Sequence, residues 1–286
     1  MKISQIFFVV FLSAAVAFGV GQYGKTRTEN AVTKETAFDR VMRTNKLRCS
    51  YVVLPPEFSR DPNTGVKSGV SVDLIQEISK RLNLEIEWGE EVNFATVAED
   101  LKAGRHDAFC FTSYRWVPSA RVNEYTDPLF YSATYAYVRA DDTRFDNNLA
   151  AINDPAIHVA TIDGEAAAFI KAQDYPLSTA YSMPQNTDVS FLLQAVVDKK
   201  ADITFTNPLV VMGYLESHPN VLKRVVVKEP IQIHSHSFVL AKGEHNLLSM
   251  FNVVLDELHQ DGTMDRILDK YESIPNSFVR VKRVLP

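Results

Sequence analysis

The sequence predicts an α/β fold in two lobes, each built on a largely parallel sheet. Short apolar runs that are typical of buried strands alternate with longer amphipathic segments that are typical of helices. This alternation occurs before residue 140 and again between residues 157 and 206, which suggests two units of similar size. A chain of 286 residues, 46% of them hydrophobic, is long enough to bury two cores.

The first unit begins with a short helix that runs into a strand over residues 37–53. The sequence PPEFSRDPNTG predicts a loop, because proline, aspartate, asparagine and glycine occur there at the density of a turn. Residues 70–83 predict a helix, since four apolar side chains fall on one helical face. These are Val72, Ile75, Ile78 and Leu82. Residues 84–88 alternate strictly, with Leu84, Ile86 and Trp88 on one side, which predicts a half-exposed strand.

The remaining elements continue the alternation. An amphipathic helix is expected over residues 94–107, closed by Gly104 at its C-terminal cap, and a buried strand over 108–112. The second unit predicts a strand, two helices and a strand, at residues 157–165, 166–173, 189–200 and 201–206. A strand at 236–243 and two helices within 245–271 complete the pattern.

The N-terminus has the features of an export signal. The sequence MKISQ is followed by IFFVVFLSAAVAFGV, which has no charged residue. We expect residues 1–21 to be a signal peptide, cleaved after Ala17, or a membrane anchor if cleavage does not occur. Residues 22–36 are polar and aperiodic and are expected to be a linker. In both cases most of the chain lies outside the cytoplasm.

The two cysteines, Cys49 and Cys110, lie in runs that predict buried strands. An oxidising compartment permits a disulfide, but two buried thiols are the simpler interpretation. No CxxC, haem or zinc spacing is present in the sequence. His234 and His236 share one strand face but lack a third ligand nearby in the sequence, so we expect exposed strand histidines and no metal or cofactor.

Charge and motifs exclude two classes of function. The formal net charge is −5 and the basic residues are scattered, which weighs against nucleic-acid binding. The sequence contains no G-x-S-x-G, H-E-x-x-H or P-loop motif, and we assign no catalytic residue.

The ends of the predicted strands give the candidate site. In open α/β sheets, ligands bind outside the carboxyl ends of the strands. The residues at these ends are Tyr51 with those that follow it, Phe111 to Trp116, Asp163 to Ala166, and Thr206 to Pro208.

Seven segments occur in the order that one family shows, and they cover Phe38 to about Tyr271. They are KLRCSYVVLPPEF, GVSVDLIQEISKRLNLEIEW, LKAGRHDAFCFTS, EYTDPLFYSATYAYVR, IDGEAAAFI, KKADITFTNP and DGTMDRILDKY. In these segments the chain resembles the extracytoplasmic solute-binding proteins, family 3, that serve polar amino-acid ABC transporters. The resemblance implies a type II periplasmic-binding-protein fold, in which two α/β lobes are joined by two hinge strands.

The same resemblance implies the domain organisation and the partners. Lobe 1 would comprise residues 37–139 and 234–286, and lobe 2 residues 140–233. A periplasmic monomer would capture a small ligand by hinge closure and deliver it to the membrane permease of an ABC transporter.

The family typically holds an α-amino acid with an arginine of lobe 1 and an aspartate of lobe 2. Gapless matching places Ser119 and Asn207 at these two positions. Neither side chain balances a buried charge, so both charged contacts are expected to be missing. Three alternatives remain open for the nearby arginines: Arg121 takes the role, Arg115 reaches in from the strand end, or both are solvated.

The resemblance also places aromatic residues near the ligand, namely Phe94, Phe111, Tyr114 and Trp116. Such a site suits an apolar or planar ligand, or a cation held by π faces. The alternative is that some of these rings, Phe111 above all, belong to the lobe core. Thr112 and Ser113 offer hydroxyls and backbone N–H groups at the strand end, or serve only the turn.

In the family, the turn before the helix at 166–173 contacts the ligand carboxylate. Glu165 and Ala166 lie at this helix N-terminus, where backbone N–H groups favour an anion. The charge of Glu165 would oppose an anionic ligand, and capping of the helix is the simpler role for it.

Three hypotheses for function follow from these observations. The first is a solute-binding protein for an amino-acid-like or related organic solute. The second is an enzyme of the cyclohexadienyl dehydratase type on the same fold, with Glu165 as its acid or base. The third is an anchored sensor or accessory protein.

Overall fold

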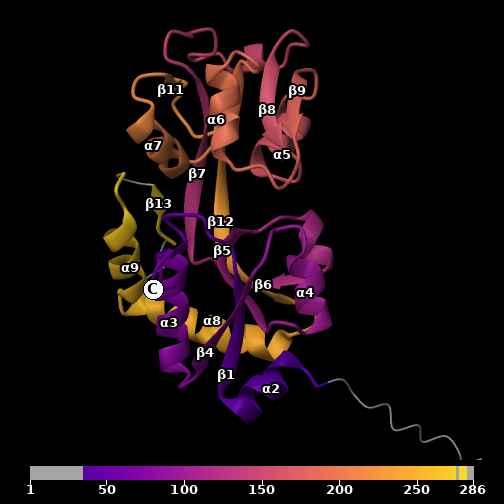
Figure 1. Cartoon of the computed structure of the whole chain (residues 1–286), viewed down its shortest axis with the longest axis vertical. Helices are drawn as coiled ribbons and strands as arrows, with labels where there is room; N and C mark the ends of the chain where they lie inside the picture. Colours follow the sequence, from indigo (N-terminus) through magenta and orange to yellow (C-terminus); the bar gives the residue numbers. More distant parts are fainter. Residues whose placement is uncertain (1–34, 275–276, 282–286) are drawn as a thin grey trace, which may run out of the picture. The chain divides into compact units, whose positions relative to one another are not determined.

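Two long antiparallel strands, β7 (Phe130–Arg139) and β12 (Gln232–Ala241), form the centre of the fold (Figure 1). Residues 130–134 of β7 pair with β12, whereas residues 135–138 pair with β10 (Ile203–Thr206). A single strand therefore belongs to both halves of the sheet, which has the order β4-β1-β5-β12-β7-β10-β8-β9.

The computed structural model describes residues 35–274 and 277–281. The described residues from Ala37 onward form one compact unit. The expected signal segment and almost all of the expected linker lie outside the described residues. Within the described ranges, no helix is both long and apolar enough to cross a membrane.

The first lobe contains a parallel arrangement of three strands beside β12. β1 (Lys46–Tyr51) pairs in parallel with β4 (Glu85–Glu91) and with β5 (Ala108–Tyr114). Its helices are α2 (Ala37–Thr44), α3 (Val70–Arg81), α4 (Val97–Ala103), α8 (His245–Gln260) and α9 (Thr263–Tyr271). Its smaller elements are β2 (Ser59–Arg60), β3 (Lys67–Ser68), η1 (Pro118–Arg121), β6 (Asn123–Tyr125) and β13 (Phe278–Val279).

The second lobe repeats the parallel arrangement. β8 (His158–Ile162) pairs in parallel with β9 (Thr179–Met183) and with β10. Its helices are α5 (Ala166–Asp174), α6 (Ser190–Val197) and α7 (Pro208–Ser217), with η2 (Leu149–Ile152) and β11 (Leu222–Arg224) completing it. β7 ends at Arg139 and β12 begins at Gln232; the lobe boundaries at 139/140 and 233/234 stay a prediction.

The predicted apolar faces form the core of the first lobe. On α3, Ile75 and Ile78 are fully buried, Val72 is 1% exposed, and Leu82 packs against the same core as a half-buried residue. On β4, Trp88 is half-buried between exposed residues, as the strict alternation predicts. Gly104 ends α4 in the left-handed conformation, with φ of 73°, which confirms its predicted role as a C-terminal cap.

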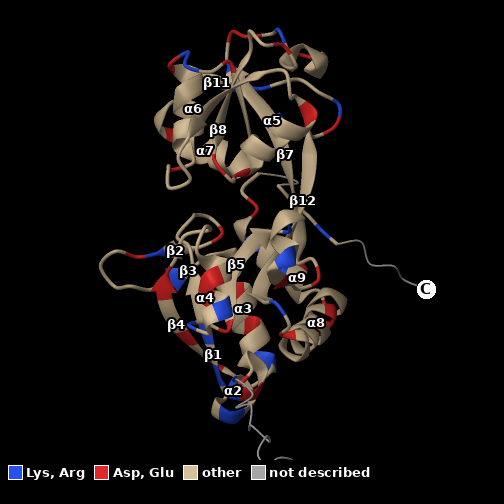
Figure 2. Ribbon diagram, turned by 90° about the vertical axis from the view of Figure 1, so that its right-hand side faces the viewer, with Lys and Arg blue, Asp and Glu red and all other residues tan. Residues whose placement is uncertain are grey.

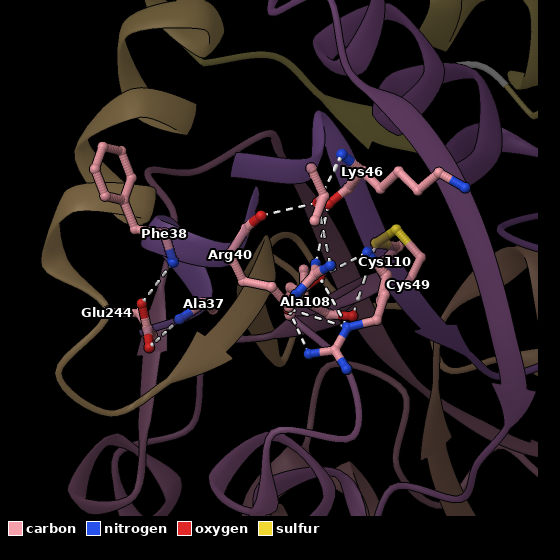
Figure 3. Close-up of polar contacts among 11 residues, drawn as sticks. Ala37, Phe38, Arg40, Lys46, Cys49, Ala108, Cys110 and Glu244 are labelled. Carbon is pink, nitrogen blue, oxygen red and sulfur yellow. Dashed lines mark hydrogen bonds and ion pairs between the residues drawn. A yellow bond between two sulfur atoms is a disulfide. The ribbon is translucent and has the colours of Figure 1, made fainter. Parts of the chain in front are cut away.

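Cys49 and Cys110 form a disulfide, so the expectation of two buried thiols is wrong (Figure 3). Both residues are fully buried, as their apolar surroundings predict. They lie on the adjacent parallel strands β1 and β5 with their Cα atoms 5.4 Å apart, a separation that a disulfide spans. The sequence does not show that these strands, 61 residues apart, are neighbours.

The expectation that His234 and His236 are exposed is also wrong. They are 8% and 3% exposed on β12. The ring of His236 makes two polar contacts, through Nδ1 with the carbonyl of Thr112 at 2.9 Å and through Nε2 with the hydroxyl of Ser132 at 2.8 Å. Residues of the flanking strands β5 and β7 therefore surround the ring of His236.

Charged side chains are interspersed rather than segregated by sign. Figure 2 shows basic and acidic residues mixed along the elements of both lobes. Some charges fix the ends of elements. The carboxylate of Glu244 accepts the backbone N–H groups of Ala37 at 2.9 Å and Phe38 at 3.2 Å, which anchors the first turn of α2 (Figure 3).

Candidate functional site

Three of the predicted site residues lie inside the first lobe. Tyr51 is 3% exposed and stacks on Phe58 with ring centroids 4.6 Å apart. Phe111 is 4% exposed and packs beside Phe109. Thr112 is 1% exposed, and its backbone N–H donates to Ser71 Oγ at 3.0 Å. These side chains support the sheet and α3.

Two other predicted residues lie near these buried ones. Phe94 is 39% exposed and meets the rings of Phe109 and Phe111 edge-on, at 6.0 and 5.6 Å. Ser113 is half-buried and pairs with Ser237 of β12.

Tyr114 and Trp116, at the end of β5, reach residues of the second lobe. The side chains of Asn207 and Ser132 hydrogen-bond the Tyr114 hydroxyl, and burial raises its pKa. The ring of Trp116 lies 4.8 Å from that of Phe169 on α5. Aromatic and polar contacts from the two lobes therefore meet at this strand end, where ligands of open α/β sheets bind.

Glu165 lies at the N-cap position of α5, but its carboxylate accepts no hydrogen bond from the helix. The expectation that this side chain caps the helix is therefore wrong. The carboxylate is largely buried, and burial raises its pKa. It also acts electrostatically on the Tyr114 hydroxyl. Ala166, the first residue of α5, is half-buried beside it.

Asn207 and Ser119 use their polar atoms locally. Asn207 Oδ1 accepts the backbone N–H of Val210 at 3.0 Å and caps α7. The hydroxyl of Ser119 donates to the carbonyl of Trp116 at 3.1 Å and also contacts the hydroxyl of Tyr125. Neither residue supplies a charge.

Arg115 and Arg121 are both exposed. In the described part of the chain, neither guanidinium makes an ion pair or a side-chain hydrogen bond. The backbone N–H of Arg115 donates to the carbonyl of Ser235 at 3.1 Å, which fixes the main chain but leaves the side chain directed to solvent.

A second buried carboxylate, Glu57, was not predicted. It lies in the loop between β1 and β2, is 6% exposed, and acts electrostatically on the Tyr114 hydroxyl. Burial raises its pKa to about 7. Within the described ranges, its side chain has no ion-pair partner.

The loop that carries Glu57 is held against the start of α3. The carbonyl of Glu57 accepts the backbone N–H of Ser71 at 2.9 Å. Gly69 approaches so closely that an added Cβ would lie 2.5 Å from this carbonyl oxygen, and its φ of 124° also favours glycine. The position of the glutamate is therefore fixed by the backbone.

His234 completes the group of side chains around Tyr114. Its ring stacks on that of Tyr114 at 4.6 Å and lies 5.3 Å from Trp116. Its Nε2 is buried without a hydrogen-bond partner in the described structure, and burial lowers its pKa to about 4. We call this group the inter-lobe cluster; it comprises Glu57, Tyr114, Trp116, Glu165, Phe169, Asn207 and His234.

A hollow lies between the loop that follows β1 and the helices α6 and α7. It has a volume of about 430 Å³ and is lined by Leu54 and Pro55 of the first lobe and by residues of α6 and α7. Leu54 and Pro55 precede Glu57 in the same loop, and α7 begins after Asn207. The hollow has the size that small-molecule sites occupy, but its lining includes no residue of the inter-lobe cluster.

The sequence contained partial signals for the members that were missed. Glu57 follows the end of β1 by a few residues, so the rule on strand ends applies to it. Phe169 lies in the first turn of a helix that was predicted. For metal binding, no group of three suitable side chains occurs among the residues that the structure describes.

Comparison with known proteins agrees with this architecture. The model of the bacterial extracellular solute-binding proteins, family 3, matches residues 50–273. The chain is 24% identical over 268 residues to a probable histidine-binding protein of Campylobacter jejuni subsp. jejuni, covering 93% of this chain and 98% of that protein. It is 23% identical over 232 residues to a probable amino-acid ABC transporter-binding protein of Haemophilus influenzae, covering 80% and 85%.

Among solved structures, the chain resembles an ancestral amino acid-binding protein described as a precursor of cyclohexadienyl dehydratase. The TM-score is 0.70 at 20% identity, and the match covers 82% of this chain and 99% of the other. At this identity the likeness concerns the fold. The chain belongs to the bacterial extracellular solute-binding proteins of family 3 and has their two-lobed type II periplasmic-binding-protein fold.

Proposed function

We propose that this protein captures a small amino-acid-like or related organic solute in the periplasm and delivers it to the permease of an ABC transporter. The observation that carries the proposal is the inter-lobe cluster, in which Trp116 contacts Phe169 and Tyr114 contacts Asn207. Relatives named as binding proteins of amino-acid transporters support the same function.

Hinge closure is the mechanism that this arrangement favours. Only β7 among the strands pairs with strands of both lobes in the described part of the chain, so bending of β7 and β12 changes the distance between the lobes. A ligand that contacts both lobes binds the closed state more tightly than the open state, and this difference shifts the population. We propose that the exported protein acts as a monomer and is not an enzyme.

The dehydratase alternative is less well supported. Glu165 is a largely buried carboxylate that could move a proton, but among the described residues its side chain makes no hydrogen bond or ion pair. The relatives named above are binding proteins. Turnover of a cyclic carboxylate by the purified protein would support the dehydratase alternative.

The test is a ligand screen on the protein purified from the periplasm of an expression host. A ligand at about 100 times its Kd adds roughly 2.7 kcal/mol to the free energy of unfolding, which raises Tm measurably. Closure is followed by the fluorescence of Trp116 in Trp88→Phe, because the chain contains only two tryptophans. A ligand that raises Tm without changing this emission or the radius of gyration would contradict hinge closure.

A further inference from the structure

We propose that the hollow between the loop after β1 and the helices α6 and α7 is a second ligand site, which takes a planar ring compound without a negative charge. Its volume of about 430 Å³ is enough for a small molecule. Its lining shares no residue with the inter-lobe cluster. This inference therefore goes beyond the proposed function and does not depend on it.

The first argument concerns Gly213, which lies inside α7 and lines the hollow. A glycine within a helix is less favourable than an alanine, because its backbone loses more conformational freedom on folding. Among the described residues packed around α7, no heavy atom would lie within 4 Å of a Cβ added at Gly213. Its backbone conformation does not require glycine either. The missing side chain leaves room for a molecule to lie against α7.

The second argument is that both lobes contribute to the lining. Leu54 and Pro55 come from the first lobe, whereas α6 and α7, which lie side by side, come from the second (Figure 1). Leu209 of α7 lines the hollow and is also buried in the hydrophobic cluster that forms the core of the first lobe. A ligand in the hollow would contact both lobes and would therefore favour this arrangement of them.

The third argument is the aromatic character of the lining. Phe191 of α6 lines the hollow and is 54% exposed. Tyr214 and His218 also line it, and their rings stack with centroids 4.3 Å apart and planes 12° apart. Aromatic rings pack against planar molecules in offset-stacked or edge-on contacts. A planar ring compound therefore matches these side chains better than a flexible aliphatic chain does.

The fourth argument concerns charge. The lining contains no lysine or arginine, whereas Asp188 contributes a carboxylate. This carboxylate accepts the backbone N–H of Ser190 at 2.8 Å and the hydroxyl of the same residue at 2.6 Å. Within the described ranges, no basic side chain pairs with it. An anionic ligand would thus meet a negative charge and no permanently charged cation, so the site disfavours anions.

The experiment uses four probes that share one ring system: indole, tryptamine, indole-3-acetamide and indole-3-acetate. Calorimetry on the exported protein measures their Kd values. We expect indole-3-acetamide to bind at least about threefold more tightly than indole-3-acetate, which has the same shape but carries a negative charge. Asp188→Asn should remove this difference.

Three further variants assign the binding to the hollow. Gly213→Leu places a side chain in the space and should weaken binding of indole-3-acetamide by about tenfold or more. Leu54→Ala shortens the wall from the first lobe and should weaken it by about threefold or more. Glu216→Leu introduces the same side chain on α7 outside the lining and should leave Kd unchanged. Circular dichroism verifies that each variant is folded.

Gly213→Ala tests the argument from the glycine separately. Its Tm should rise above that of the wild type, because alanine is the better helix former and its Cβ meets no neighbouring atom. A lower Tm would show that the fold itself requires glycine there, and the first argument would be wrong.

Three outcomes overturn the inference. Absence of binding by all four probes shows that the hollow takes no such ring compound. Tighter binding of indole-3-acetate than of indole-3-acetamide contradicts the assigned charge. Equal binding by the wild type and Gly213→Leu shows that the probes bind elsewhere. If Trp116→Ala then abolishes that binding, the probes lie at the inter-lobe cluster, and the proposed function stands without a second site.

Discussion

The ring of Trp116, which follows β5, lies 4.8 Å from the ring of Phe169 on α5, so two aromatic side chains form a contact between the lobes. Both residues are half-buried. The contact is available to stabilise the closed state that ligand binding favours.

We expect Trp116→Ala and Phe169→Ala each to weaken ligand binding. Because the two rings contact each other, the double variant should show a coupling of about 0.5–1.5 kcal/mol. Calorimetry with the ligand found in the screen measures this coupling. Leu177→Ala, which removes an apolar side chain that is 61% exposed before β9, is the control. Strictly additive losses would show that the rings act independently.

Glu57 should make stability depend on pH. Burial raises the pKa of its carboxyl from 4.5 to about 7, so between these values the folded state binds more protons than the unfolded state. Its contribution to the free energy of unfolding therefore falls as pH rises through this window. Glu57→Gln should gain stability relative to wild type across it, by up to about 3 kcal/mol.

Urea unfolding of both proteins between about pH 4 and pH 8 measures this difference. The other titratable groups, Tyr114 among them, are present in both proteins, so their titration largely cancels in the comparison. A difference that stays constant with pH would mean that Glu57 is not buried as described.

His234 should make the free energy of unfolding depend on pH in the opposite direction. Burial lowers its pKa from 6.5 to about 4, so the unfolded state binds more protons between these values. The stability associated with the neutral ring is complete above pH 6.5 and is lost as pH falls toward 4. His234→Phe keeps a ring on Tyr114 and should reduce this acid sensitivity.

The same substitution removes a buried nitrogen without a hydrogen-bond partner, so we expect a gain of about 1 kcal/mol at neutral pH. Thermal unfolding across the acid range measures both effects. His245→Gln, which changes an exposed histidine at the start of α8, should show neither. Unchanged acid sensitivity in His234→Phe would rule out this histidine as its source.

The disulfide should contribute to stability because it closes a long loop. Cys49 and Cys110 are 61 residues apart, and Cys49→Ala with Cys110→Ala should lower the free energy of unfolding by about 2–4 kcal/mol. Chemical unfolding of the oxidised protein and of the double variant measures the loss. Free thiols titrated in the unfolded, unreduced wild type would contradict the bond itself.

Asn207 should stabilise α7 through its cap. Asn207→Ala removes the acceptor for the Val210 N–H and should cost about 1 kcal/mol. Asn207→Ser retains a capping oxygen and should remain near wild type in urea unfolding. If serine and alanine were equally destabilising, the contact of Asn207 with Tyr114 would be the larger contribution.

The helices and strands could be predicted because their signals are local. The apolar face of α3, the alternation in β4 and the glycine at the end of α4 depend only on neighbouring residues. The disulfide depends on which strands become neighbours, and this is a property of the whole sheet. Two buried strands with one cysteine each are compatible with a bond or with two thiols.

The candidate site was less predictable than the fold. Tyr114, Trp116, Glu165 and Asn207 come together from three strand or helix ends, as the rule on strand ends suggests. Thr112 and Phe111 lie on the same strand but pack inside the lobe. The burial of His234 could not be inferred, because the sequence does not show that the rings of Tyr114 and Trp116 pack against it.

β7 imposes one register on both lobes at once. Side chains on a strand alternate between faces, so a slip of one residue exchanges the two faces completely. Phe130 packs in the core of the first lobe and Ala136 and Val138 in that of the second, on the same unbroken strand. A single residue inserted between Thr134 and Tyr135 could keep the β7 side chains of one lobe on their own faces. It would then move the β7 side chains of the other lobe to the opposite faces. Insertions in this segment should therefore be far less tolerated than insertions in the loops that connect the outer helices of the lobes.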